Sequence, residues 1–207
     1  HGGNVESFRN CTHLNGNLVI RKDSFDHSSQ WDPMTGAVTL TTPVTAEALE
    51  ALSSLRKVSG HVFVQGKLEN LNFLRNLRVI EGRRLMSDRF ALDITGNSNL
   101  RSLGLRSLEA IRAGDVNIMG NPELCYIHNI NWTRFFTQPD RQRYREEKSR
   151  SEKVCEEREG ASFDVECDAS QSCWGPGPGN CMQCLHFELE GACVASCSPE
   201  AGQLVVG

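Results

Sequence analysis

The residues best suited to chemistry stand near the end of the chain, in the stretch CWGPGPGNCMQC from Cys173 to Cys184. A stretch so rich in thiols could hold a metal, carry out redox exchange or form structural disulfides. A zinc ribbon needs two paired knuckles, but only Cys181 and Cys184 have the CxxC spacing, and the nearby imidazole is His186 alone. A redox CxxC needs a strand-to-helix setting rather than a preceding GPGPGN. We therefore expect disulfides here, with no metal and no cofactor.

The cysteines also divide the chain into two parts. Cys11 stands alone in the first 124 residues, and the other eight follow: Cys125, Cys155, Cys167, Cys173, Cys181, Cys184, Cys193 and Cys197. The last third is too poor in core residues to fold without cross-links, so the chain changes character near residue 155. Two N-glycosylation sequons, at Asn10 and Asn131, agree with a secretory or extracellular compartment.

Bulk composition narrows the classes of partner. The 207 residues carry a formal net charge of -4, which gives no reason to expect nucleic acid or an anionic membrane as a partner. No apolar run approaches the roughly 18 residues of a membrane span. The opening HGGNVESF lacks the apolar region of a signal peptide, so we expect either a processed chain or a fragment.

A repeat in the first 130 residues indicates which elements position these features. Its members have apolar residues three apart and then a glycine: Phe8-Cys11-Leu14-Gly16, Leu52-Leu55-Val58-Gly60, Leu74-Leu77-Ile80-Gly82 and Leu105-Leu108-Ile111-Gly114. Short alternating runs begin at residues 18, 38, 62, 92 and 116, at spacings of 20, 24, 30 and 24. Three alternating residues predict a strand with one buried side, and recurrence at this period predicts turns that stack.

The sequence thus predicts a mainly β chain, a β-solenoid of about five or six turns followed by a small disulfide-rich module. Asn97 and Asn121, each after a glycine, are expected to bond the backbone of the adjacent turn. A short helix is expected from Thr45, which would be its N-cap, and another through Asn131 to Phe136. The charged run RQRYREEKSR, residues 141–150, is interpreted as a solvated face or loop.

Strand alternation also predicts an outward face. If the apolar residues point inward, one sheet displays Val19, Arg21, Thr39, Thr41, Phe63, Gln65, Asp93, Thr95, Asn117 and Met119. This mixture suits a protein-binding surface better than a catalytic cleft. A polysaccharide-cleaving β-helix enzyme would need clustered carboxylates, whereas this face offers only Asp93. The chain also lacks HExxH, phosphate-loop and nucleophile-elbow motifs, so we expect no enzymatic activity.

Five stretches resemble one known family. They are NCTHLNGNLVI, LRVIEGRRL, LGLRSLEAI, GNPELCYIHNINW and CWGPGPGNCMQC. Together they resemble the second ligand-binding L domain of the epidermal growth factor (EGF) receptor family, with the start of the next cysteine-rich domain. The resemblance implies a right-handed β-helix at residues 1–155 and a furin-like cysteine-rich module at 156–207. The long stretch between Phe25 and Pro43 suggests an invertebrate member.

The resemblance further implies a disulfide pattern and an interdomain contact. Its pairs are Cys125–Cys155, Cys167–Cys181 and Cys184–Cys193. Cys11 and Cys197 would pair beyond this chain, and Cys173 lacks its usual partner, which would fall near Phe163. Either Cys173 is therefore free, or the cysteines of the module pair differently. Trp174 is expected to wedge into the L domain, with a partly exposed loop side chain as the alternative.

Function follows from the same resemblance. It implies that an EGF-like growth factor binds on the sheet, at positions matching Val19, Arg21, Gln65, Phe90, Thr95 and Asn117, to which alternation adds Phe63. Asp26 and Asp32 are both candidates for the acidic residue that holds an arginine of the ligand. The implied parent is a cell-surface receptor tyrosine kinase whose kinase lies outside this chain. Other ectodomain segments and a second receptor copy would be its partners; a secreted decoy receptor is the alternative.

Overall fold

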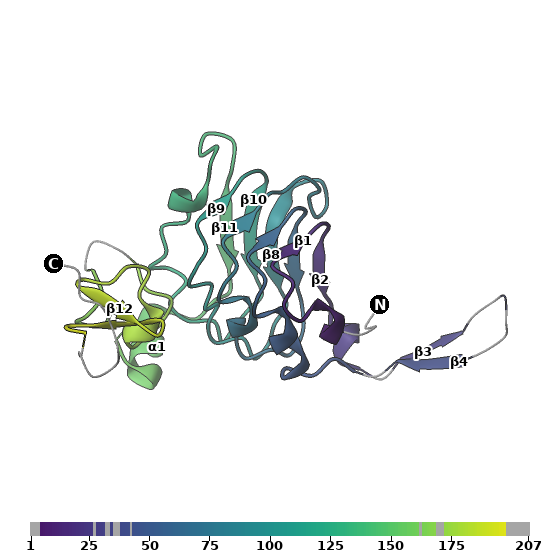
Figure 1. The fold of residues 1–207 in the computed structure, drawn as a ribbon, viewed down its shortest axis with the longest axis horizontal. Helices are drawn as coiled ribbons and strands as arrows, with labels where there is room; N and C mark the ends of the chain where they lie inside the picture. Colours follow the sequence, from purple (N-terminus) through teal and green to yellow (C-terminus); the bar gives the residue numbers. More distant parts are fainter. Residues whose placement is uncertain are drawn as a thin grey trace. The chain divides into compact units, whose positions relative to one another are not determined.

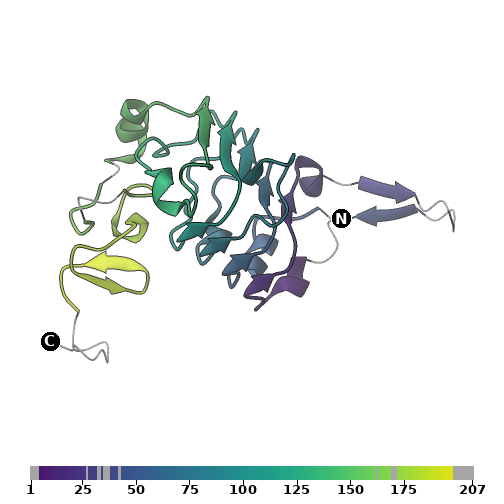
Figure 2. The ribbon, with the colours of Figure 1, turned by 90° about the horizontal axis from the view of Figure 1, so that it is seen from above.

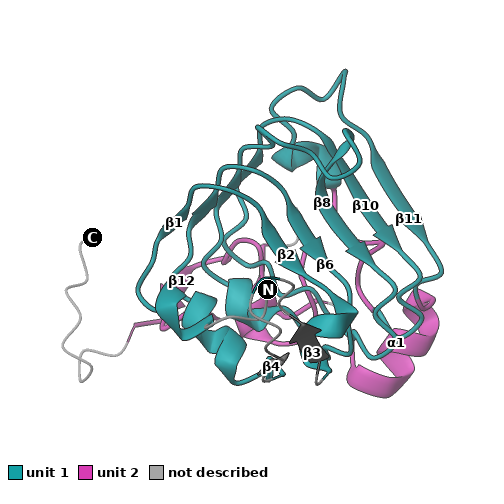
Figure 3. Cartoon of the chain, turned by 90° about the vertical axis from the view of Figure 1, so that its right-hand side faces the viewer, with its two compact units in different colours: residues 1–124, 132–149 teal, residues 125–131, 150–207 magenta. Residues whose placement is uncertain are grey.

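The computed structural model describes residues 5–26, 28–31, 34, 38–41, 43–161, 163–168 and 172–197. This part of the chain is mainly β, with several short 3-10 helices and one α-helix, α1 (Glu152–Glu159). Two compact units are distinguished in Figure 3: residues 1–124 with 132–149, and residues 125–131 with 150–207. No helix in the described ranges has the length and apolar character that a bilayer crossing requires.

Two parallel sheets build the first unit (Figure 1). The larger sheet, which we call the platform sheet, has the order β11-β10-β8-β6-β2: β2 (Leu18–Ile20), β6 (Val62–Val64), β8 (Phe90–Thr95), β10 (Asp115–Met119) and β11 (Tyr144–Glu147). The smaller sheet has the order β1-β5-β7-β9: β1 (His13–Leu14), β5 (Lys57–Val58), β7 (Val79–Ile80) and β9 (Ala110–Ile111). From β5 to β10 the chain alternates between the sheets, and each pass adds a parallel neighbour to both.

The repeated apolar segments lead into the smaller sheet and form the core. Leu74, Leu77 and Ile80 are all 0% exposed, as are Leu105 and Ile111 in the next copy. The glycine that follows is needed for space: at Gly82, with φ +65°, an added Cβ would lie 2.3 Å from the Ala113 backbone oxygen. The repeat therefore encodes both the apolar contacts and the corner that lets the next segment pack closely.

The inward side of the platform sheet is the one that alternation predicts. The eight apolar residues at positions 18, 20, 62, 64, 92, 94, 116 and 118 are each at most 8% exposed. Their strands are in register, with Leu18 opposite Val62, Val62 opposite Leu92 and Leu92 opposite Val116. Identical register in successive strands stacks these side chains into continuous apolar columns.

Two buried asparagines link neighbouring strands just after the ends of β8 and β10. Asn97 donates from Nδ2 to the backbone oxygen of Val64 (3.2 Å) and to Oδ1 of Asn121 (3.0 Å). Asn121 in turn donates from Nδ2 to the backbone oxygen of Ile94 (3.0 Å). The predicted bonds from asparagine to adjacent backbone are confirmed, and they satisfy carbonyls that a corner would otherwise leave unpaired.

The strand expected at residues 38–40 is not part of the platform sheet. β4 (Val38–Thr41) pairs antiparallel with β3 (Ser28–Trp31) in a separate two-stranded sheet, seen away from the stacked strands in Figure 2. β2 pairs directly with β6 instead. The prediction that Thr39 and Thr41 lie on the outward face was therefore wrong. Alternation identifies a strand but not its partner. Here β4 is the second strand of a hairpin with β3 and does not pair with β2.

The platform sheet is completed instead by β11, which lies inside the run interpreted as a solvated face or loop. β11 pairs parallel with β10, with Val116 opposite Tyr144. Tyr144 stacks on Trp132, with ring centroids 5.2 Å apart. A charged strand is possible here because one aromatic contact and the ladder with β10 supply the stabilisation that alternating apolar residues supply elsewhere.

The helices of the first unit are short. They are η1 (Val5–Phe8), η2 (Lys22–Phe25), η3 (Ala48–Leu52), η4 (Asn72–Leu74) and η5 (Trp132–Phe135). The Thr45 hydroxyl accepts a hydrogen bond from the Ala48 backbone N–H at 3.2 Å, but the N-cap of η3 is Glu47, so the prediction of Thr45 as the N-cap was wrong. The helices expected at 45–52 and 131–136 both exist, but as the short 3-10 helices η3 and η5.

The second unit is held together by disulfides. It contains α1, η6 (Pro178–Asn180) and the antiparallel pair β12 (Phe187–Leu189) and β13 (Ala192–Val194). Its bonds are the three pairs that the resemblance implies: Cys125–Cys155, Cys167–Cys181 and Cys184–Cys193. The Tyr126 hydroxyl donates to the Gly160 backbone oxygen at 2.9 Å, which fixes α1 within this unit.

Candidate functional site

The outward face of the platform sheet carries a central column of side chains. Register places Val19 opposite Phe63, Phe63 opposite Asp93, Asp93 opposite Asn117 and Asn117 opposite Arg145. Val19 is 41% exposed and Arg145 is exposed, whereas the three central residues are only 6–7% exposed. The column therefore has accessible ends and a closed centre, which strand alternation alone does not predict.

A second column runs beside it. It contains Gln65, Thr95 and Met119, all half-buried, and the exposed Arg21 follows β2 at its end. An added Cβ at Gly96 would lie 3.3 Å from the Gln65 side-chain nitrogen, so the Gln65 amide lies over the corner after β8. We call the two columns without Arg145 the platform: Val19, Arg21, Phe63, Gln65, Asp93, Thr95, Asn117 and Met119.

The centre of the platform is polar. Asn117 donates from Nδ2 to Oδ1 of Asp93 at 2.8 Å. Burial raises the pKa of Asp93 above its ordinary value; the Asn117 hydrogen bond and the nearby His61 oppose this rise only in part. His61, 6% exposed, directly precedes β6 and was not among the residues predicted from sequence, because it falls just outside the alternating run.

Phe90 lies at the start of β8 and is half-buried. The ladder between β8 and β10 has an irregularity at this point, where Asp115 is opposite Phe90 and Val116 is opposite Leu92. The Arg89 guanidinium lies 5.5 Å from the centroid of the Phe90 ring and donates from Nε to Asp115 at 2.8 Å. The irregularity means that alternation does not decide which face Phe90 serves.

The two candidates for the acidic ligand contact differ in what the structure describes. Asp26 is exposed and follows η2, with its backbone N–H donating to the Asp23 oxygen at 3.3 Å. Asp32 lies outside the described residues. No contact in the described ranges brings Asp26 onto the platform.

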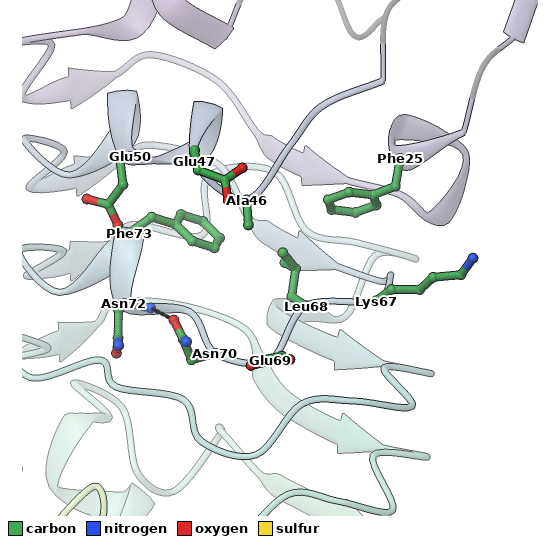
Figure 4. Close-up of a pocket in the computed structure, with 10 residues that line it drawn as sticks. All are labelled: Phe25, Ala46, Glu47, Glu50, Lys67, Leu68, Glu69, Asn70, Asn72 and Phe73. Carbon is green, nitrogen blue, oxygen red and sulfur yellow. Dashed lines mark hydrogen bonds between the residues drawn. The ribbon is translucent and has the colours of Figure 1, made fainter.

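A pocket of about 660 Å³ is lined in part by Lys67, two residues after Gln65 in the sequence (Figure 4). The rings of Phe25 and Phe73 and the side chain of Leu68 lie on its walls, and its charged residues are Glu47, Glu50, Lys67 and Glu69. Gly66 adjoins the Phe25 ring, since an added Cβ there would lie 2.5 Å from it. Sequence reasoning missed this pocket because it is built from 3-10 turns and connections rather than from the repeat.

Two cysteines of the stretch CWGPGPGNCMQC form a sulfur cluster with Cys167. Sγ atoms of Cys167, Cys173 and Cys181 lie within 4.8 Å of one another, but Cys167 and Cys181 are joined as a disulfide. Cys173 is a buried free thiol, which is one of the two outcomes left open by its missing partner, and burial raises its pKa. Two of the three sulfurs are therefore not thiolates, and this donor set does not fit a metal ion.

Three other predicted residues can be placed by exposure. Trp174 is 2% exposed, which excludes the partly exposed loop alternative. Asn10 and Asn131 are both exposed, as glycan attachment requires.

Comparisons with known proteins agree with this arrangement. A sequence model described as "Receptor L domain" matches residues 10–136. The chain is 34% identical over 203 residues to the epidermal growth factor receptor of Drosophila melanogaster, which covers 95% of this chain and 14% of the relative. It is 33% identical to the epidermal growth factor receptor of Apis mellifera, over 96% of this chain and 15% of the relative. It is also 33% identical to receptor tyrosine-protein kinase erbB-2 of Mesocricetus auratus, over 94% and 15%.

The chain thus spans about one seventh of the length of these curated relatives. The matched family region contains both parallel sheets up to β10 and all of the platform. The chain belongs to the receptor L domain family, and its similarity to epidermal growth factor receptors extends over nearly its full length.

Proposed function

We propose that this chain binds an EGF-like growth factor on the platform and is part of the extracellular region of a receptor tyrosine kinase. The observation that carries the proposal is the in-register outward face of β2, β6, β8 and β10, in a chain of the receptor L domain family. Apolar Val19 and Met119 stand beside polar Gln65 and Thr95 there, a composition suited to protein recognition.

Finer features belong to the same proposal. The chain is the second L domain, residues 1–155, wound as a right-handed β-helix of five or six turns. The start of a cysteine-rich domain follows at residues 156–207. Its parent is an invertebrate receptor, which the two insect relatives favour. The role of Trp174 as an interdomain wedge, which the family resemblance implies, belongs to the same proposal.

The chain itself is a binding module rather than a catalyst. Its place outside the cell is supported by three disulfides and by two exposed sequons. The proposed kinase activity belongs to the longer parent protein, as the name of the erbB-2 relative suggests. Other ectodomain segments and a second receptor copy are the proposed partners of that parent.

A titration of the immobilised chain with a panel of recombinant EGF-like domains tests the proposal. We expect weak, saturable binding of at least one domain. Val19→Asp, Gln65→Ala and Phe90→Ala should each weaken it by roughly 5- to 50-fold, as truncation of interface anchors does. Asp140→Asn, an exposed acid outside the platform, is the control. Binding that is unchanged in all three variants would place the site elsewhere.

A further inference from the structure

The centre of the platform holds polar side-chain atoms without a hydrogen-bond partner among the described residues. Oδ1 of Asp93 accepts from Asn117, and no described residue donates to its Oδ2. Oδ1 of Asn117 and Nε2 of His61 are both buried without a partner among the described atoms. We call Asp93, Asn117 and His61 the acceptor cluster.

The role of the His61 ring follows from its other nitrogen. Nδ1 of His61 lies 3.2 Å from the Arg84 backbone oxygen. A carbonyl oxygen only accepts, so Nδ1 of His61 carries a proton and donates it to this oxygen. The ring also lies close enough to Asp93 to interact with it electrostatically. Oδ2 of Asp93 and Oδ1 of Asn117 are therefore the acceptors of this cluster that remain open to a donor.

A second buried carboxylate shows how this protein otherwise satisfies such a group. Glu81, next to the smaller sheet, is 5% exposed and is surrounded by Lys57 at 2.7 Å, Arg83 at 2.7 Å and Arg112 at 3.3 Å. Asp93 is equally buried, yet no lysine or arginine in the described ranges lies within ion-pair distance of it. Arg89, which directly precedes β8, the strand that contains Asp93, forms its ion pair with Asp115 instead.

The position of the cluster makes an external donor possible. Asp93, Asn117 and His61 keep 6–7% of their surface exposed, whereas the inward neighbours Leu92 and Ile94 keep none. The cluster thus forms the floor of the platform rather than part of the core. A buried carboxylate with a vacant oxygen is costly, and that cost is recovered when a charged donor arrives.

We propose that the acceptor cluster receives a basic side chain of the bound EGF-like domain, and thereby selects growth factors that present Lys or Arg to the centre of the platform. This inference rests on the proposed function. A Lys ammonium offers three donors and an Arg guanidinium five, and neither has an acceptor, which matches the open oxygens of Asp93 and Asn117. Phe63 and Val19, adjacent in the same column, would pack on the aliphatic stem of that side chain.

The test is a double-mutant cycle between the two proteins. The receptor variant is Asp93→Asn, and the probes are the EGF-like domain that binds in the titration above and variants in which each Lys and Arg is changed in turn to Met. We expect Asp93→Asn to weaken binding at least roughly 10-fold, as removal of one partner of a desolvated charge pair does. One ligand substitution should weaken binding to the wild-type chain similarly but change binding to Asp93→Asn by less than about 3-fold.

The outcomes separate this inference from the proposed function. If Val19→Asp and Gln65→Ala abolish binding while Asp93→Asn and every ligand substitution act independently, the cluster holds only water and this inference fails alone. If no platform variant affects binding, both fail. Circular dichroism of Asp93→Asn guards against a folding defect, and Asp140→Asn is the matched control for loss of one acidic charge.

Discussion

At the scale of single residues, the account depends on side chains whose surroundings differ from what their type suggests. Asp93 is a carboxylate on an outward face, yet it is 6% exposed and its pKa is raised by burial. Cys173 is a thiol beside a disulfide, yet it is buried and its pKa is raised as well. Both residues should therefore behave differently from exposed residues of the same type.

Asp93→Asn should stabilise the free chain near neutral pH. A carboxyl whose pKa is raised by folding contributes stability that is present below its unfolded value of 3.8 and is lost as the pH rises through the folded value. Neutral Asn keeps the Asn117 hydrogen bond and avoids that loss, so the free energy of unfolding at pH 7 should rise by on the order of 1 kcal/mol. The gain should vanish below about pH 3.8, where both side chains are neutral.

Urea unfolding of wild type and Asp93→Asn at pH 7 and pH 3.5 measures this effect. A variant that is less stable than wild type at pH 7 would show that the carboxylate is already compensated within the chain. Its charge would then be unavailable to a ligand.

Cys173 should react with iodoacetamide far more slowly than the exposed Cys11. The thiolate is the reactive form, and burial both hides the sulfur and raises its pKa, so the difference should narrow at alkaline pH or in denaturant. Mass spectrometry of tryptic peptides after timed alkylation follows both sites in one sample. Equal rates at pH 7.5 in the native chain would contradict the buried position of Cys173.

At the scale of elements, the sequence predicts the strands that alternate and misses those that do not. β2, β6, β8 and β10 each carry two buried apolar residues flanking one outward residue, and this pattern identifies them directly. β11 (YREE) has Tyr144 as its only large apolar group, so its pairing with β10 depends on a neighbour that no local pattern reveals. Residues 38–40 show the reverse case, since their alternation is real but their partner is β3.

The sequence likewise predicted only those residues of the candidate site that lie in alternating strands. Alternation indicated Phe63, Asp93 and Asn117 as outward residues. Their burial could not be inferred, because it depends on side chains from neighbouring strands. His61 and the pocket at Phe25 and Phe73 lie outside the repeat and left no periodic signal.

The pair Asn97 and Asn121, which follows β8 and β10, should contribute strongly to the stability of the fold. Asn121→Ala removes the bond to the Ile94 oxygen and the acceptor of two bonds from Asn97, all of them buried. We expect a loss of about 2–4 kcal/mol in the free energy of unfolding, because several buried polar groups lose partners at once. Asn99→Ala, at an exposed position nearby, should change it by less than about 0.5 kcal/mol. Similar losses in the two variants, measured by thermal or urea unfolding, would refute a structural role for the ladder.

At the scale of the whole molecule, the two compact units use different means of stabilisation. The first buries stacked apolar columns between two parallel sheets, and its one cysteine, Cys11, forms no disulfide with a described residue. The second has little apolar content and contains all three disulfides. Reduction should therefore affect the units unequally.

The Cys125–Cys155 bond joins residues 30 apart in sequence. Loop entropy of this size is worth roughly 3–4 kcal/mol, and that of the bond between Cys184 and Cys193 is about 0.5–1 kcal/mol less. Changing Cys125 and Cys155 to Ser should therefore lower the stability of the second unit more than changing Cys184 and Cys193 to Ser. Hydrogen exchange, resolved by peptide, should show faster exchange over α1 in the first case and unchanged protection in β6 and β8. Loss of protection throughout both sheets would mean that the units do not unfold separately.

The central claim is that the outward face of the platform sheet is the growth-factor site. Hydrogen exchange of the chain with and without a saturating EGF-like domain tests it most directly. We predict slower exchange in peptides that contain β2, β6, β8 and β10, and no change in β1, β5, β7 and β9. Protection confined to the smaller sheet or to the cysteine-rich unit would contradict the account.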